Sequence, residues 1–102
     1  MAELTQRTYF VTLFTTAFSS MEDVRRQAPE ALQRHIERTR RLHAEGVLLM
    51  AGAFLEPTEG PISTMAVLAS REAAEDFIRG DPFVELGMVE THEIREWSNM
   101  LR

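Results

Sequence analysis

Two stretches of the chain are apolar on both faces of an extended strand, and this feature constrains the fold more than any other. Residues 8–18 read TYFVTLFTTAF, rich in aromatic and β-branched side chains, and residues 47–55 form the nearly continuous apolar run VLLMAGAFL. Both predict strands. A strand that is covered on one face only alternates between apolar and polar side chains. Neither run alternates, so both faces of the sheet that contains them must be covered.

Two further segments predict strands. ISTMAVLA, residues 62–69, follows the second apolar run after EPTEGP, a sequence typical of a turn, so these two runs are expected to pair as a hairpin. VETHEIREW, residues 89–97, predicts the last strand.

Two helical regions are predicted between the strands. The first runs from Ser20, a residue type favoured at the N-cap, to Gly46, and Pro29 divides it into a short and a long helix. The second begins after Ser70, again a favourable N-cap, and ends at Gly80. The order of elements is therefore strand, helix, strand, strand, helix, strand.

This order predicts one α+β domain over residues 1–102 with the ferredoxin-like βαββαβ fold. Such a fold has a four-stranded antiparallel sheet with its helices on one face. The helices leave the opposite face open, although the strands are apolar there as well. A second copy of the chain, packed sheet against sheet, is the economical cover. We therefore expect a homodimer that forms a dimeric α/β barrel.

Composition and charge argue against several classes of protein. The net charge is −5, and the arginines of residues 34–41 are interleaved with glutamates, which predicts a solvated helix face rather than a nucleic-acid site. No apolar run approaches the roughly 20 residues that span a bilayer, and no secretion signal is visible. The chain has no cysteine, so disulfides and thiolate chemistry are excluded. We expect a cytoplasmic protein without nucleic-acid or membrane partners.

His35 is the first candidate for chemistry. At about 100° per residue it lies on the same side of the long helix as Leu32, Ile36 and Thr39, facing inward or along the rim. A single histidine on an apolar face is more often a hydrogen-bonded core residue than a catalyst. Only a partner can separate these two interpretations.

Asp81, between Gly80 and Pro82 in RGDPFVELG, is the candidate partner. Both helices of this fold lie on one face of the sheet, so the loop after the second helix can approach the first. There the carboxylate can accept a hydrogen bond from His35, fix the ring tautomer and stabilise the imidazolium, which makes a general base or acid. Alternatively, Asp81 shapes the turn through an Asx-type bond. The two roles are compatible, because a carboxylate has two oxygens.

Nearly the whole chain resembles the YciI-like, or YCII-related, domain family. The resemblance rests on RHIERTRRLHAEGVLLMAGAF and EAAEDFIRGDPFVELGMVETHEIREW. The shared marks are a helical histidine before a leucine and a glycine, then LL-x-AG, then D-P-F with a glycine after it. In this sequence they are His35, Leu42, Gly46, Leu48, Leu49, Ala51, Gly52, Asp81, Pro82, Phe83 and Gly87.

The resemblance implies a dimeric α/β barrel of ferredoxin-like subunits, similar in fold to muconolactone isomerases and small monooxygenases. It also implies that His35 and Asp81 are the catalytic pair, and that the chemistry is proton transfer or elimination on hydroxylated aromatic rings. Three features depart from the family pattern. The acidic residue that many members carry near the end of the third strand is missing from MAVLAS. Ala53 stands where many members have a proline, and Glu96-Trp97 stands where many end in P-W or P-F. The departures leave the His35–Asp81 pair intact, but this protein need not share a substrate with other members of the family.

No metal or cofactor site is predicted. His35 and His43 lack the i,i+4 spacing of a helical metal pair, and His92 is expected on an edge strand. The sequence has no glycine-rich phosphate loop and no serine in a nucleophile elbow.

Two hypotheses from different classes follow. In the first, the protein is a small cofactor-independent enzyme, in which Asp81 orients His35 for an isomerisation or elimination on a small hydroxylated aromatic or enolisable substrate. In the second, it is a non-catalytic homodimer that binds a metabolite or partner, and the His–Asp pair is structural. An open cavity at His35 is expected only for the first. The candidate pocket walls are four aromatic residues, Tyr9, Phe14, Phe54 and Phe83.

Overall fold

The computed structural model describes residues 7–101, and its elements follow the predicted order with one addition. The addition is the short helix α4, which begins directly after Asp81. Among the described residues no helix is both long and apolar enough to cross a membrane. The elements are β1 (Thr8–Thr16), α1 (Met21–Gln27), α2 (Pro29–Ala44), β2 (Leu48–Ala53), β3 (Ser63–Leu68), α3 (Arg71–Arg79), α4 (Pro82–Glu85) and β4 (Val89–Ser98).

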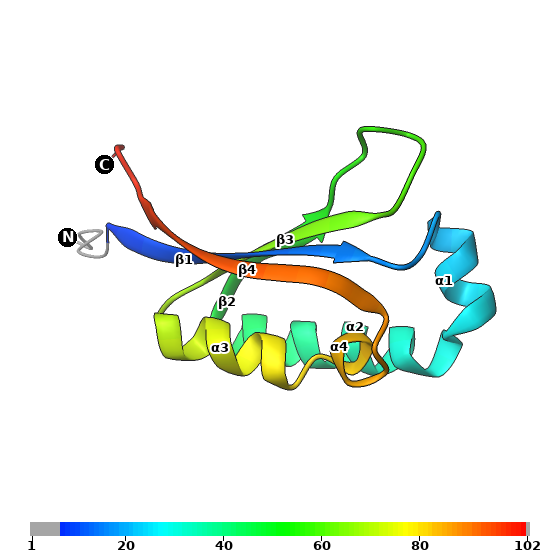
Figure 1. The fold of residues 1–102 in the computed structure, drawn as a ribbon. Helices are drawn as coiled ribbons and strands as arrows, with labels where there is room; N and C mark the ends of the chain where they lie inside the picture. The colour runs from blue at the N-terminus through cyan, green and yellow to red at the C-terminus, as the bar shows by residue number, and fades with distance from the viewer. Residues whose placement is uncertain (1–6, 102) are drawn as a thin grey trace.

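The four strands form one antiparallel sheet in the order β2-β3-β1-β4. This is the ferredoxin-like α+β arrangement, so the predicted fold class is confirmed. Figure 1 shows α2, α3 and α4 beneath one face of the sheet, with α1 beyond the end of β1. The loop between β2 and β3 extends away from the helices.

The ends of the helices follow from their local chemistry. The Ser20 side chain accepts a hydrogen bond from the backbone N–H of Asp23 and caps α1, while Pro29 occupies the first turn of α2, where its missing N–H costs nothing. Gly46 follows α2 with a φ of +76°, a left-handed conformation that favours glycine. Ser70 caps α3 as predicted.

The hydrophobic core lies between the sheet and the helices. Phe14 of β1, Leu68 of β3 and Phe77 of α3 are its large buried members, and the Phe14 and Phe77 rings stack with centroids 6.1 Å apart. Burying each of these side chains stabilises the fold by about 1.5–3 kcal/mol. The contact fixes α3, and with it the chain that follows, relative to the sheet.

A second buried cluster explains why β1 ends at Thr16, two residues before the predicted boundary. The chain leaves the sheet there, and Phe18 turns towards the helices, where its ring meets the Phe83 ring edge-on at 5.6 Å. Val24 of α1 and Ala31 of α2 complete the cluster. It joins the start of α2, the helix that carries His35, to α4, the helix that begins directly after Asp81.

The opposite face of the sheet is also apolar, as the two unbroken runs predicted. Directly paired residues point to the same face, and here Val67 of β3 pairs with both Val11 and Met50, while Met65 pairs with Leu13. No described helix covers this face (Figure 1). Met50 is 68% exposed.

Candidate active site

His35 and Asp81 meet in the structure although 46 residues separate them in the sequence. The His35 Nδ1 lies 2.8 Å from the Asp81 Oδ1. His35 comes from the second turn of α2, and Asp81 from the junction between α3 and α4. The Asp81 side chain is 1% exposed and the His35 side chain 30% exposed. The carboxylate is therefore enclosed, whereas the imidazole reaches open space.

The second oxygen of Asp81 holds the carboxylate in place. Oδ2 accepts hydrogen bonds from the backbone N–H groups of Phe83 and Val84, at 3.0 and 3.2 Å. Asp81 is thus the N-cap of α4, and Pro82 takes the first helical position, where no N–H is needed. The cap and the histidine contact use different oxygens, so the geometry contains both of the roles considered for this residue.

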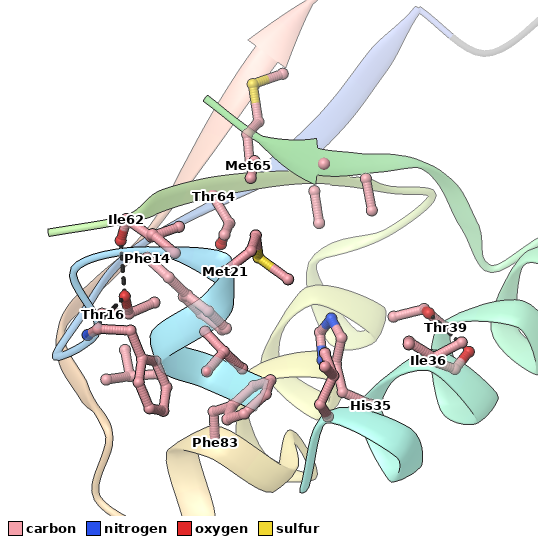
Figure 2. A pocket seen from close by; sticks show the side chains of 18 of the residues that line it. Phe14, Thr16, Met21, His35, Ile36, Thr39, Ile62, Thr64, Met65 and Phe83 are labelled. Carbon is pink, nitrogen blue, oxygen red and sulfur yellow. Dashed lines mark hydrogen bonds between the residues drawn. The ribbon is translucent and has the colours of Figure 1, made fainter. Parts of the chain in front are cut away.

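The imidazole of His35 has one nitrogen engaged and one facing the cavity. A carboxylate can only accept, so Nδ1 carries the proton and donates it to Asp81. In the neutral ring Nε2 then has a free lone pair, and it has no hydrogen-bond partner among residues 7–101. The Phe83 ring packs beside the imidazole, with centroids 5.3 Å apart. Figure 2 shows the His35 ring rising from α2 towards the sheet.

A cavity of about 310 Å³ opens at His35, between the helices and the sheet. Its wall is mostly apolar, and Figure 2 shows side chains of α1, α2 and β3 around it. No lining residue other than His35 has an ionisable side chain within the described part of the chain. The lining includes Phe14, Met21, Ile36, Ala53, Ile62 and Phe83.

Of the four aromatic residues expected as pocket walls, the structure brings two to His35. Phe14 and Phe83 line the cavity. Tyr9 packs against Trp97 of β4 with ring centroids 6.2 Å apart and does not line it. Phe54 borders a separate hollow of about 270 Å³ on the other side of β2 and β3. Strand membership could not separate Tyr9 from Phe14, because it does not tell which face of the sheet the helices cover.

Three threonines also line the cavity, and the sequence analysis predicted none of them as site residues. The Thr16 hydroxyl donates to the Ile62 carbonyl, and the Thr39 hydroxyl donates to the Ile36 carbonyl. Thr64 lies on β3, and its hydroxyl has no hydrogen-bond partner among residues 7–101. In Figure 2 its oxygen points down into the cavity. Only the β3 register reveals this, since Thr64 shares the helix-facing side with Ala66.

The other two histidines lie elsewhere. The His43 ring bonds through Nδ1 to the Leu48 carbonyl at 2.9 Å, which ties the end of α2 to the start of β2. His92 lies on the edge strand β4, with its ring 6.4 Å from that of Phe14. No group of three potential metal ligands occurs within residues 7–101.

Fold and site together define a small ferredoxin-like α+β protein that holds a His–Asp pair at the mouth of an apolar cavity. The sequence profile of the YCII-related domain matches residues 11–98, and the chain belongs to this family. No curated protein sequence matches it significantly.

Solved structures with the same fold have very different sequences. The 5-chloro-2-hydroxyhydroquinone dehydrochlorinase TftG of Burkholderia phenoliruptrix, solved with 2,5-dihydroxybenzoquinone, superposes with a TM-score of 0.65 at 16% identity, covering 88% of this chain and 93% of its own. A putative antibiotic biosynthesis monooxygenase of Nitrosomonas europaea has a TM-score of 0.57 at 9% identity, covering 97% and 96%. PA3566 of Pseudomonas aeruginosa has 0.56 at 12%, covering 98% and 100%. These likenesses establish the fold.

Proposed function

We propose that the protein is a small cofactor-independent enzyme in which the Asp81-oriented His35 moves a proton in an isomerisation or an elimination. The substrate is a small hydroxylated aromatic or enolisable molecule. The observation that carries this proposal is the open cavity at His35, because a purely structural tie between two helices needs no empty space beside the imidazole. A buried carboxylate holding one ring nitrogen while the other faces a cavity is the arrangement that general base catalysis needs.

The chemistry balances with His35 alone as the proton carrier. Nε2 takes a proton from a C–H or O–H group of the bound molecule, and the Asp81 carboxylate stabilises the resulting imidazolium. In an isomerisation the imidazolium returns the proton to another atom of the substrate. In an elimination the electron pair instead expels a leaving group. A positioned base of this kind accelerates a reaction by about 10²–10⁴-fold.

The lining of the cavity supports a neutral substrate about the size of one ring. Its volume is at the lower end of the range for small-molecule sites, roughly 300–1,000 Å³. A carboxylate or phosphate buried there would find no arginine or lysine to pair with, which is unfavourable. TftG, the dehydrochlorinase with the same fold, was solved with 2,5-dihydroxybenzoquinone, a compound with a single ring.

We assign the walls of this site to the aromatic rings of Phe14 and Phe83 and a second polar contact to Thr64. The two rings line the cavity from β1 and α4. The Thr64 hydroxyl, free of partners among residues 7–101, can bond to a substrate oxygen while His35 engages another. Tyr9 and Phe54 are left out of the site, since neither lines the cavity.

We also propose that the protein is a homodimer packed through the uncovered face of the sheet. Met50, Phe54 and Trp97 are 68%, 48% and 50% exposed, and exposed apolar groups of this size gather at interfaces. Light scattering at micromolar concentration should give twice the mass of the chain. A monomer at that concentration would refute the dimer and leave the catalytic proposal standing.

The catalytic proposal is tested by proton exchange. The protein is incubated in D2O with a panel of neutral dihydroxybenzenes, quinones and enolisable ketones, and deuterium incorporation or halide release is measured by NMR and mass spectrometry. Wild-type protein should convert at least one class, and His35→Ala should lose about 10²–10⁴-fold in rate.

His43→Ala and His92→Ala are the matched controls, because each removes an imidazole that lies outside the cavity. Both should keep near-wild-type rates. If panel members bind but none is converted, and His35→Ala only lowers the melting temperature, the protein is the alternative, a ligand-binding homodimer with a structural His–Asp pair.

A further inference from the structure

Arg38 does not belong to the solvated arginine face that the sequence suggested. Arg34, Arg40 and Arg41 are exposed, but Arg38 is half-buried and reaches across from α2 to the end of α3. Its Nη1 donates to the Phe77 carbonyl at 2.9 Å and its Nη2 to the Asp76 carbonyl at 2.8 Å. Its Cζ lies 5.5 Å from the centre of the Phe77 ring.

These two carbonyls belong to the last turn of α3, directly before Asp81. The Asp81 N–H would reach the Phe77 carbonyl if the helix continued, but it bonds to the Ile78 carbonyl instead, at 3.2 Å. Arg38 therefore satisfies the carbonyl that the chain leaves open where it turns towards α4. Arg38 and His35 lie three residues apart on α2 and therefore on the same face of that helix. This face both supplies the imidazole and binds the end of α3, directly before Asp81.

Gly80 makes this approach possible. A Cβ at this position would lie 2.7 Å from the Arg38 Nη2 and 3.0 Å from its Cζ. The Gly80 backbone, at φ −98° and ψ 4°, is open to other residues, so the requirement for glycine is one of space rather than of conformation. Any side chain here displaces the guanidinium before it strains the backbone.

Charge supports the same arrangement. Burial lowers the pKa of Arg38, while the Asp81 carboxylate acts in the opposite direction and favours the charged guanidinium. Arginine stays protonated under all ordinary conditions. A positive charge is therefore held at the end of α3, close enough to the Asp81 carboxylate for the two to interact electrostatically.

We propose that Arg38 and Gly80 together set the turn that carries Asp81, which makes Arg38 a positioning residue for the His35–Asp81 pair. Its consequence for catalysis rests on the function proposed above. Its consequence for the His35 tautomer does not depend on that function. An experiment on the tautomer can therefore test the positioning role separately from catalysis.

The experiment records the ring nitrogens of His35 by ¹⁵N NMR at alkaline pH, where the imidazole is neutral, in wild type and in three variants. Wild type should show the proton on Nδ1. Arg38→Met, which keeps an apolar stem but removes both donors, should shift His35 towards the mixed tautomers of free imidazole. Gly80→Ala should do the same by displacing the guanidinium. Arg40→Met, an exposed arginine on the same helix, is the matched control and should match wild type.

Two further measurements distinguish positioning from a purely structural role. The double variant Arg38→Met/Gly80→Ala should be no worse than the more affected single variant, because both act on one contact. With a substrate in hand, Arg38→Met should lower kcat about 10–100-fold and change KM little, as expected when a catalytic group is displaced without loss of binding. Arg38→Lys, which keeps the charge but not the fork of donors, should restore only part of the loss.

If Arg38→Met and Gly80→Ala lower the unfolding midpoint yet leave the proton on Nδ1, Arg38 is only a helix cap and this inference is wrong, while the proposed function stands. If wild type itself carries the proton on Nε2, the His–Asp pair does not form as described, and both proposals fail.

Discussion

Two buried aspartates lie at the starts of helices in this protein, and they differ in how far away in the sequence their hydrogen-bond partners lie. Asp23 in α1 accepts from the Ser19 N–H at 3.0 Å, from Gln27 at 2.6 Å and from Arg26 at 2.7 Å, all within four residues. Asp81 makes comparable local bonds, to the N–H groups of α4, and adds His35, 46 residues away.

The difference separates a helix end from a site. Every bond of Asp23 closes within one turn, so its carboxylate orders α1 and nothing else. One oxygen of Asp81 caps α4 in the same way, and the other holds an imidazole at a cavity. A capping aspartate becomes part of a candidate active site when the fold brings a second helix against it and leaves open space beside the partner. Changes that affect one aspartate and spare the other test this distinction.

The largest expected difference is in catalysis. Asp81→Asn keeps an oxygen for the α4 cap but no longer presents a carboxylate to His35, so turnover should fall about 10²–10⁴-fold. Asp23→Asn should stay within about twofold of wild type, because no bond of Asp23 reaches the cavity. Rates are measured on the substrate found by deuterium exchange. Equal losses in the two variants would show that the aspartates matter only through stability.

The next largest effect is on folding. Asp81→Ala removes the α4 cap and leaves the half-buried His35 without its partner, so the free energy of unfolding should fall by about 2–4 kcal/mol. Asp23→Ala should cost less, since its bonds lie at the edge of the molecule and join groups that water can reach. Urea denaturation followed by circular dichroism measures both. A greater loss for Asp23→Ala would reverse the comparison.

The pH dependence of stability should isolate Asp23. The hydrogen bond from the Ser19 backbone N–H, and next the one from the Gln27 side-chain amide, hold the pKa of Asp23 below its ordinary value of 3.8. A carboxyl with a lowered pKa stabilises the fold above its ordinary pKa and loses that contribution as the pH falls through the folded-state value. The urea midpoint of wild type should therefore exceed that of Asp23→Asn near neutral pH, and the gap should narrow as the pH falls below 3.8. A gap that stays constant would mean that the charge of Asp23 contributes nothing.

The smallest effect concerns the caps themselves. Ser20→Ala removes the hydroxyl oxygen that accepts from the Asp23 N–H, and Ser70→Ala removes the oxygen that accepts from the Ala73 N–H in α3. Each should cost about 1 kcal/mol, or roughly 4–8 °C in melting temperature for a domain of this size. If Ser20→Ala costs clearly more, the Asp23 network and the Ser20 cap act as one unit, and the α1 end is more cooperative than a single cap.

Most of the fold could be predicted from the sequence because its determinants are local. Ser20 and Ser70 mark helix starts through bonds to their own neighbours, and Pro29 does so through its position in the first turn. The apolar runs of β1 and β2 mark strands through their composition. The order of the elements then limits the sheet to few topologies. Helix α4 was missed, because a four-residue helix after a proline has the same local pattern as a turn.

The site was predictable only in part, and for the same reason. His35 and Asp81 carry local marks, a helical face and an aspartate before a proline, and the fold brings them to 2.8 Å. Thr64 carries no such mark, since its place in the cavity depends on the register between β3 and β1. Tyr9 and Phe14 lie on the same strand with similar chemistry, yet only Phe14 faces the helices at the end where His35 stands.

The sequence by itself therefore determined the element order, the helix caps, the apolar character of both sheet faces and the candidate pair. The tertiary structure alone decided the cavity, the pocket walls and the part played by Arg38. An arginine among glutamates has the pattern of a solvated face, and its bonds to Asp76 and Phe77 follow only when α3 ends beside α2 with a glycine at the point of contact. Local bonds are encoded within a turn of the chain, whereas contacts between elements depend on how every element packs.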